Sequence, residues 1–130
     1  MIGIDTNVLV RFLTQDDPNQ SALAVRLLQS AESSRVKVRI NLLVLVETTW
    51  VLRSAYGHSP STILSIVERL LETPPLEVES ASLVRQAVAQ SREGKHELPD
   101  VLIGLLNAGC QTTWTFDVKA AKLPGFSFLK

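Results

Sequence analysis

The sequence predicts an α/β fold in which helices cover a parallel sheet. Short apolar runs, typical of buried strands, alternate along the 130 residues with longer segments of helical periodicity. Two of the longer segments begin with a capping signal in which a polar residue precedes a proline. Strand–helix alternation favours parallel pairing, and ligands of such sheets bind beyond the carboxyl ends of the strands.

The composition is that of a globular protein. With 45% hydrophobic and 20% charged residues, the chain is expected to form one domain, residues 1–130, around a single core. Thirteen basic and thirteen acidic residues neither require nor exclude a nucleic-acid partner. No apolar run of membrane length and no signal peptide is evident, so a cytoplasmic location is the default expectation. Cys110, the only cysteine, is expected to be a small core residue.

In the first half of the chain, capping residues mark where helices begin. Asp17 is expected to cap a helix in which Pro18 is the first residue and Gln20 the third. Asn41 is a second capping residue, because a helical pattern follows it directly. The expected elements are a strand at Ile2–Ile4, a helix beginning within Val8–Leu13, a helix from Pro18 to about Ser33, a strand at Val36–Ile40 and a helix at Leu42–Ala55.

The second half continues the alternation. A helix starts at Ser59-Pro60, ends before Pro74-Pro75 and carries an apolar stripe that core packing and a subunit contact explain equally well. The stripe consists of Ile63, Ile66, Val67, Leu70 and Leu71. The remaining elements are a strand at Leu76–Val78, a helix at Ala81–Arg92, a helix from Pro99 to about Ala108 and strands at Thr113–Phe116 and Phe126–Phe128.

Four acidic residues lie beside apolar segments or at the ends of predicted elements. Asp5 and Asp117 each follow an apolar strand, and Asp100 lies in the first turn of a helix. Each of these three has a structural alternative, since acids cap helices and interact favourably with helix N-termini. Glu47 has apolar neighbours three and four residues away on its helix, where a charge is costly unless a lysine or arginine covers it.

All four acids can converge on one edge of a parallel sheet. Two carboxylates ~4 Å apart repel each other by about 1 kcal/mol in water, and by more where solvent is partly excluded. A divalent cation removes this repulsion, and Glu97 is a further acid close to Asp100 in the sequence. Oxygen ligands suit Mg²⁺ or Mn²⁺, whereas the chain has no cysteine–histidine set for zinc.

Four segments resemble, in order, the motifs of PIN-domain ribonucleases, and most closely those of toxins from VapBC-type toxin–antitoxin modules. They are "IDTNVLVRFL", "LVLVETTWVLRSAYG", "ELPDVLIGLLNAGC" and "TFDVKAAKLPGF". The resemblance spans the whole chain and implies a PIN-like three-layer α/β/α fold with a central parallel sheet. It also implies RNA cleavage with Mg²⁺ or Mn²⁺, a cognate VapB-type antitoxin and a homodimer.

The resemblance assigns roles to individual residues. The family's catalytic and metal-binding acids fall on Asp5, Glu47, Asp100 and Asp117. Its additional acid falls on Glu97, although Pro99 stands where the family more often has a small residue. The small polar residues that hold these carboxylates by hydrogen bonds correspond to Thr6, Asn7 and Thr115.

The predicted reaction is hydrolysis of an RNA phosphodiester bond. Metal held by Asp5, Asp100 and Asp117, with Glu47 binding directly or through water, would activate a water molecule. His58 and His96 are expected to be surface residues, and Trp50 and Trp114 core residues. The candidate phosphate-binding residues, which a solvated helix face explains at least as well, are Arg11, Arg53, Lys119 and Lys122.

Two other functions fit part of the pattern. A phosphatase of the haloacid-dehalogenase kind also begins with a strand followed by an aspartate. It requires a second aspartate two positions on, where this chain has Asn7, and usually a longer chain. The other alternative is a PIN-fold module that binds RNA or protein without catalysis, against which the intact acids argue.

Overall fold

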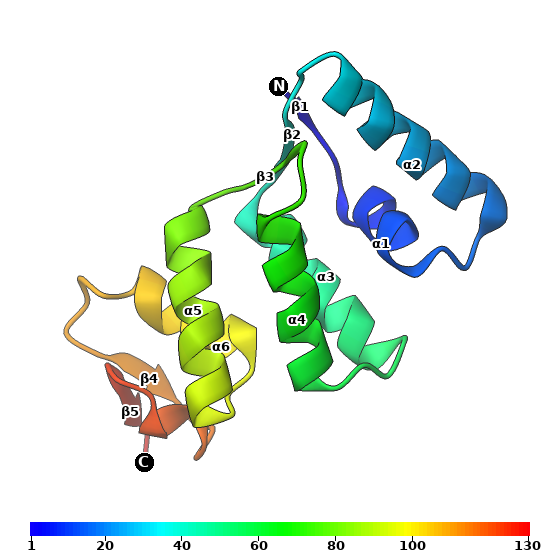
Figure 1. The fold of residues 1–130 in the computed structure, drawn as a ribbon. Coiled ribbons are helices and arrows are strands. Elements are labelled where there is room, and N and C mark those ends of the chain that lie inside the picture. The colour runs from blue at the N-terminus through cyan, green and yellow to red at the C-terminus, as the bar shows by residue number, and fades with distance from the viewer. The chain divides into compact units, whose positions relative to one another are not determined.

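The computed structural model describes residues 1–130 and contains strands and helices of the predicted kind. The chain divides into two compact units, which we call the N-terminal unit (Met1–Ala81) and the C-terminal unit (Ser82–Lys130). Figure 1 labels the α-helices and strands of both units. None of the helices combines the length and the apolar character needed to span a bilayer.

The N-terminal unit contains a parallel sheet of order β1-β2-β3. Its strands are β1 (Ile2–Gly3), β2 (Val38–Ile40) and β3 (Leu76–Val78). In this register Val38 pairs with Ile2 on one side and with Leu76 on the other. Val38 and Ile40 are fully buried, while Arg39, on the opposite face of β2, is partly exposed. The core of this unit therefore lies on one face of β2.

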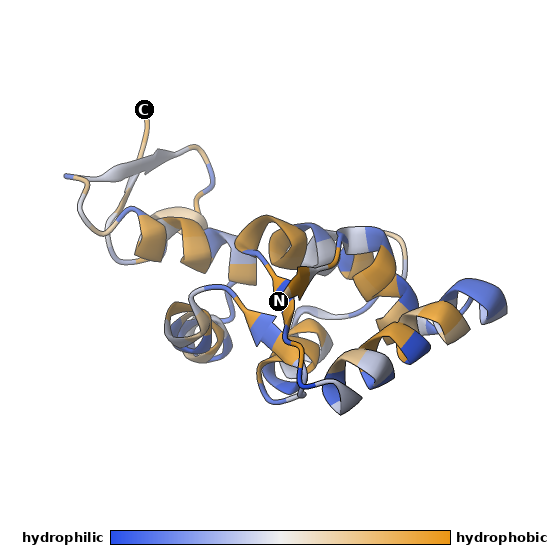
Figure 2. Cartoon of the chain, turned by 90° about the horizontal axis from the view of Figure 1, so that it is seen from above, coloured by the Kyte–Doolittle hydropathy of each residue, from blue (hydrophilic) through white to orange (hydrophobic).

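The helices of this unit begin at the predicted capping residues. They are α1 (Thr6–Thr14), α2 (Pro18–Ser33), α3 (Leu42–Ser54) and α4 (Pro60–Leu71). The caps are Asp5, Asp17, Asn41 and Ser59, and the side chain of each accepts a hydrogen bond from a backbone N–H three residues further on. Orange and blue segments alternate along the helices in Figure 2, as expected for helices with one buried face.

The C-terminal unit joins two helices to a pair of parallel strands. Its elements are α5 (Ala81–Gly94), α6 (Leu98–Leu106), β4 (Thr113–Thr115), the 3₁₀ turn η1 (Ala120–Lys122) and β5 (Phe126–Phe128). β4 and β5 pair in register from Thr113–Phe126 to Thr115–Phe128. α6 packs closely against the second strand, since a Cβ atom on Gly104 would lie 2.7 Å from the ring of Phe126. Gly104 therefore permits close contact between α6 and β5.

The predicted α/β class and the parallel pairing are confirmed, and each predicted strand and helix is present with small differences at its ends. The apolar stripe on α4 is mainly core, because Ile63, Val67 and Leu70 are buried. Three burial predictions were wrong. Cys110 is exposed in the turn after α6, and Trp50 and Trp114 are 68% and 60% exposed. Apolar sequence neighbours therefore do not by themselves place a side chain in the core.

Candidate functional site

Asp5 leaves the end of the first strand and caps α1. Its backbone is extended, and its Oδ1 atom accepts a hydrogen bond of 3.0 Å from the N–H of Val8. The side chain is exposed. The capping role foreseen as the structural alternative is therefore present, and it uses one carboxylate oxygen. It is compatible with a ligand at Oδ2, because a carboxylate has two oxygens.

Glu47 projects from α3 toward the start of α1. The hydroxyl of Thr6 donates a hydrogen bond of 2.7 Å to its Oε1 atom. Leu43 and Trp50, its neighbours on the same face, are 71% and 68% exposed, so the apolar face is at the surface and Glu47 is exposed with them. Its charge thus keeps contact with water and needs no covering lysine or arginine. Because Thr6 directly follows Asp5 in the chain, this hydrogen bond holds the Glu47 carboxylate near the segment that carries Asp5.

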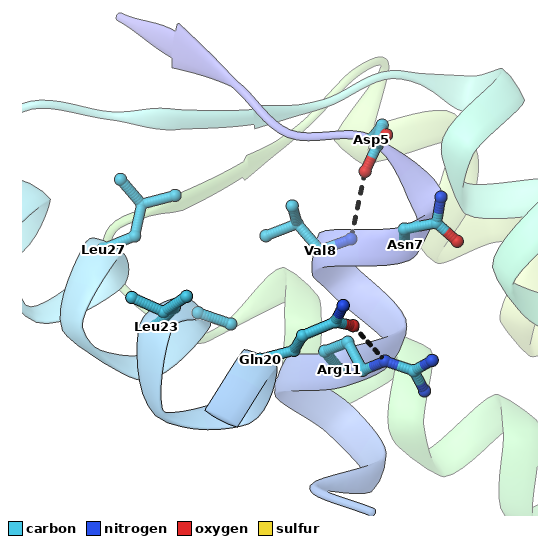
Figure 3. A pocket seen from close by; sticks show the side chains of 8 residues that line it. Asp5, Asn7, Val8, Arg11, Gln20, Leu23 and Leu27 are labelled. Atoms are coloured by element: carbon cyan, nitrogen blue, oxygen red, sulfur yellow. Dashed lines mark hydrogen bonds between the residues drawn. The ribbon is translucent and has the colours of Figure 1, made fainter. Parts of the chain in front are cut away.

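A groove of about 300 Å³ runs from Asp5 along α1 and α2. Figure 3 shows Asp5 at one end of the groove, Arg11 and Gln20 toward the other, and Leu23 and Leu27 along α2. The full lining is Asp5, Asn7, Val8, Arg11, Gln20, Leu23, Ala24 and Leu27. The groove therefore combines an apolar wall with an exposed carboxylate.

Arg11, the basic side chain of this groove, is already paired with other residues of the protein. Arg11 donates through Nε to Gln20 (2.7 Å) and through Nη1 to Asp16 (3.1 Å). Tyr56 donates a hydrogen bond of 2.6 Å to the same carboxylate. Hydrogen bonds from Tyr56 and then Thr14 lower the pKa of Asp16, and the charge of Arg11 lowers it further. Asp16 therefore stays ionised and compensates Arg11, which leaves Asp5 as the uncompensated charge of the groove.

In the C-terminal unit, Asp100 lies among other acids. It occupies the first turn of α6 and is half-buried. Burial raises the pKa of Asp100, and the nearby charges of Asp117 and Glu97 raise it further, while His96 acts in the opposite direction. The carboxylates are thus close enough to disfavour one another's ionisation, which is the electrostatic condition for attracting a cation.

Asp117 sits in a tight turn after β4. Its Oδ1 atom accepts hydrogen bonds from the N–H groups of Lys119 (2.8 Å) and Ala120 (3.1 Å), so it caps η1. Thr115 accepts a hydrogen bond from the backbone N–H of Asp117 rather than donating to its carboxylate. Like Asp5, this acid combines exposure with a capping bond through a single oxygen.

The structure groups the predicted site residues by unit. Asp5, Thr6, Asn7 and Glu47 belong to the N-terminal unit, and Glu97, Asp100, Thr115 and Asp117 to the C-terminal unit. Within neither unit do three acidic, histidine or cysteine side chains gather closely enough to hold a metal ion. The convergence of all four acids stays a prediction.

The candidate phosphate-binding residues differ in their surroundings. Lys119 and Lys122 are both exposed; Lys119 directly precedes the turn that Asp117 caps, and Lys122 is the last residue of that turn. Arg53 is exposed near the end of α3, and Arg11 is held by Asp16 and Gln20. The two lysines are therefore the basic residues placed next to a candidate acid.

Glu79, an acid at the end of a strand, was not predicted from the sequence to have a role. Glu79 follows β3, and its Oε1 atom accepts a hydrogen bond of 2.8 Å from the N–H of Leu42, the first residue of α3. The signal that could have found it is the one that drew attention to Asp5, an acid directly after an apolar strand. The partner of Glu79 lies 37 residues away in the chain, so no local pattern indicates the contact.

A protein-family model described as PIN domain matches residues 2–107 of the chain. The matched segment contains Asp5, Glu47 and Asp100 and ends before Asp117. No protein of known, curated function shows a significant match.

Proposed function

The chain belongs to the PIN domain family, and on that premise we propose that it is a metal-dependent endoribonuclease that hydrolyses RNA phosphodiester bonds. Family membership supports nuclease-type activity in general. The observation that carries the proposal further is the raised pKa of Asp100, because burial and two neighbouring acids disfavour its negative charge. Acids that repel one another in this way are typical of a site that binds a cation or a proton.

The donors fit a hard divalent cation. Asp5, Asp100 and Asp117 would be ligands, Glu47 would bind directly or through water, and Glu97 is an additional candidate. Carboxylate oxygens are the ligands that Mg²⁺ and Mn²⁺ prefer. When bound, such an ion lowers the pKa of a water molecule and stabilises negative charge on a phosphate.

The chain's own groups supply the other requirements of hydrolysis. A carboxylate of the site accepts the proton of the attacking water, as a general base. Lys119 and Lys122 hold the phosphates of the substrate, since both are exposed, one directly before and one at the end of the turn capped by Asp117. Arg11 contributes less to phosphate binding, because Asp16 compensates its charge, and Arg53 is retained as a weaker candidate.

A cleavage assay with matched variants tests the nuclease proposal. RNA should be cut with Mg²⁺ or Mn²⁺, and EDTA should abolish cleavage. Asp5→Asn should be inactive although asparagine still caps α1. Asp17→Asn is the control, because Asp17 caps α2 through the same type of bond, 3.0 Å from the N–H of Gln20. It should retain wild-type activity.

Products with 5′-phosphate and 3′-hydroxyl ends are expected if water attacks. Cleavage that survives EDTA, or 2′,3′-cyclic phosphate ends, rejects the mechanism. RNA binding without any metal-dependent cleavage favours the alternative of a catalytically silent PIN-fold module.

We also propose that this nuclease is the toxin of a VapBC-type module, inhibited by a VapB-type antitoxin. The groove supports this, because Leu23 and Leu27 are 61% and 38% exposed and Asp5 lies at its end. An amphipathic segment of the antitoxin would cover the leucines and direct an arginine or lysine toward Asp5, Asp100 and Asp117. The cation of the inhibitor would then take the place of the metal ion.

Growth measurements test this partner. The wild type, but not Asp5→Asn, should suppress growth, and co-expression of a VapB-type antitoxin encoded next to it should restore growth. Leu23→Glu should remain toxic during co-expression, whereas Leu106→Glu, which changes an exposed leucine outside the groove, should be neutralised. If every substitution of a basic antitoxin residue leaves inhibition complete, the inhibitor covers the RNA path instead of mimicking the cation.

We propose in addition that two copies of this chain form a homodimer. Leu43 and Trp50 expose an apolar surface on α3 of the kind that a second subunit covers. Sedimentation should detect a dimer, and Trp50→Glu should shift it to monomers. A dimer that this substitution leaves intact uses another face.

A further inference from the structure

Polar side chains follow all three strands of the N-terminal sheet at one edge. Asp5 comes after β1, Asn41 after β2 and Glu79 after β3, and the strands are parallel. Asp5 caps α1 and Asn41 caps α3. Glu79 precedes α5 by two residues, but its carboxylate instead bonds to α3. This acid thus acts on a helix that is not its neighbour in the sequence.

Three contacts hold Glu79 in place. Its backbone N–H donates to the carbonyl of Ile40 (2.9 Å), which extends the pairing of β2 and β3. Its Oε1 atom accepts from the N–H of Leu42 (2.8 Å), and its Oε2 atom lies 3.6 Å from Nη2 of Arg39. The carboxylate is therefore held between β2 and the first residue of α3, and both of its oxygens have partners.

This carboxylate satisfies a requirement of the α3 N-terminus. The first N–H groups of a helix have no partner within it, and the helix dipole favours a negative charge there. Asn41 satisfies the N–H of Val44, while no acid of α3 itself lies in its first turn. Glu79 supplies both the second acceptor and the charge.

The position of α3 determines where Glu47 lies. A helix is rigid over a few turns, so its first residue sets the height and rotation of the residues that follow. Glu47 follows Leu42 by five positions and reaches the hydroxyl of Thr6, next to Asp5. A shift at the start of α3 therefore changes the distance between these two acids.

We propose that Glu79 is a positioning residue that fixes α3 so that Glu47 is placed for metal binding. The inference rests on the proposed function, because it takes Glu47 as a ligand of the site. Glu79 acts through Leu42 and α3 and does not itself touch the metal or the RNA. Outer groups that orient metal ligands typically contribute about 10- to 100-fold to metal affinity or activity.

Glu77 offers a matched control on the same strand. It pairs with Arg39 and Lys37, and the side chains of Glu77 and Glu79 are 34% and 37% exposed. Glu77 has no hydrogen bond to α3, whereas Glu79 has one. Glu79→Ala and Glu77→Ala therefore remove similar surface charges, and only the first also removes an acceptor from the helix. Glu79→Gln keeps an acceptor for Leu42 without the charge.

Amide exchange of the metal-free protein is the first measurement. Glu79→Ala should accelerate exchange at Leu42 by about tenfold, because a charge-assisted hydrogen bond is lost, while Glu79→Gln and Glu77→Ala should stay within about threefold of the wild type. If the alanine variant does not fold, Glu79→Asp replaces it, since its shorter side chain keeps the charge but does not reach Leu42. Unchanged exchange at Leu42 overturns the proposal.

Metal affinity and catalysis are the second measurement. Glu79→Ala should weaken Mn²⁺ binding and lower kcat by about tenfold with KM for RNA nearly unchanged, and Glu79→Gln should recover most of both. Equal losses in Glu79→Ala and Glu77→Ala overturn the positioning role, because they would reflect charge or stability alone. If the wild type cleaves no RNA but exchange at Leu42 responds as expected, the proposed function fails while the contact from Glu79 to α3 stands.

Discussion

At the scale of single residues, the candidate acids combine a structural bond with an available oxygen. Asp5 and Asp117 each use one oxygen to cap a helical turn. Asp100 differs, because its side chain is half-buried beside other acids and its pKa is raised. Because its negative charge is unfavourable in the folded protein, Asp100 is the acid at which a proton, a cation or a neutral substitution should increase stability.

Asp100→Asn should stabilise the metal-free protein near neutral pH. A raised pKa means that the folded state binds the proton more tightly than the unfolded state, so ionised Asp100 lowers the free energy of unfolding above its folded pKa. This penalty disappears as the pH falls through the raised pKa to below the ordinary value of 3.8. The gain should be less than about 1 kcal/mol, because solvent screens a half-exposed group.

Urea unfolding of both proteins at several pH values measures this effect. The difference in the free energy of unfolding should be present at pH 7 and absent below the ordinary pKa of the carboxyl. Asp17→Asn, at a partly exposed helix cap, is the control and should show no such gain. A wild type more stable than Asp100→Asn at pH 7 in the absence of metal would contradict the crowding of acids.

Among the elements of the N-terminal unit, the cluster around Asp16 ties two helices to the segment that follows a third. Arg11 comes from α1, Gln20 from α2 and Tyr56 from the segment after α3, and Asp16 lies between α1 and α2. Because Tyr56 makes the largest contribution to the lowered pKa of Asp16, this hydroxyl couples the loop after α3 to the charge beside the groove. The cluster thus holds one end of the groove.

Tyr56→Phe should raise the pKa of Asp16 toward its ordinary value of 3.8. A lowered pKa contributes stability that is present above the unfolded value and is lost as the pH falls through the folded value. The stability difference between wild type and variant should therefore be present at neutral pH and shrink in acid. An NMR titration of the Asp16 carboxyl checks the shift, and Thr14→Val should shift it less, as the second cause. An unchanged titration in Tyr56→Phe would show that this hydrogen bond does not form in solution.

At the scale of the whole molecule, the proposed site links metal binding to folding. A ligand that binds only the folded state stabilises it by mass action, about 2.7 kcal/mol at a hundredfold excess over its dissociation constant. Thermal melts with Mn²⁺ or Mg²⁺ should therefore show a higher Tm that increases with concentration. Asp5→Asn and Asp117→Asn should lose most of this gain, and Asp17→Asn should keep it. Melts of the wild type that do not respond to either ion would count against a metal site.

Local patterns in the sequence were sufficient for the elements. Asp17 and Ser59 identify helix starts because a cap bonds to an N–H three residues further on, so cap and partner are read in one short segment. The strands at Leu76–Val78 and Phe126–Phe128 have the predicted bounds because apolar runs between turn residues indicate them directly. The positions of Asp5 and Asp117 after strands followed from the same patterns.

Packing of the folded chain sets which side chains meet and which are exposed. The bond from Thr6 to Glu47 joins residues 41 apart, and the bond from Leu42 to Glu79 joins residues 37 apart, so both depend on how strands and helices pack. Trp50 and Trp114 lie in apolar runs yet are exposed, because burial depends on what packs against a residue rather than on its sequence neighbours. The elements, the family and the candidate acids could be predicted because each depends on a local pattern of residues, whereas contacts between residues far apart in the chain form only when the chain folds.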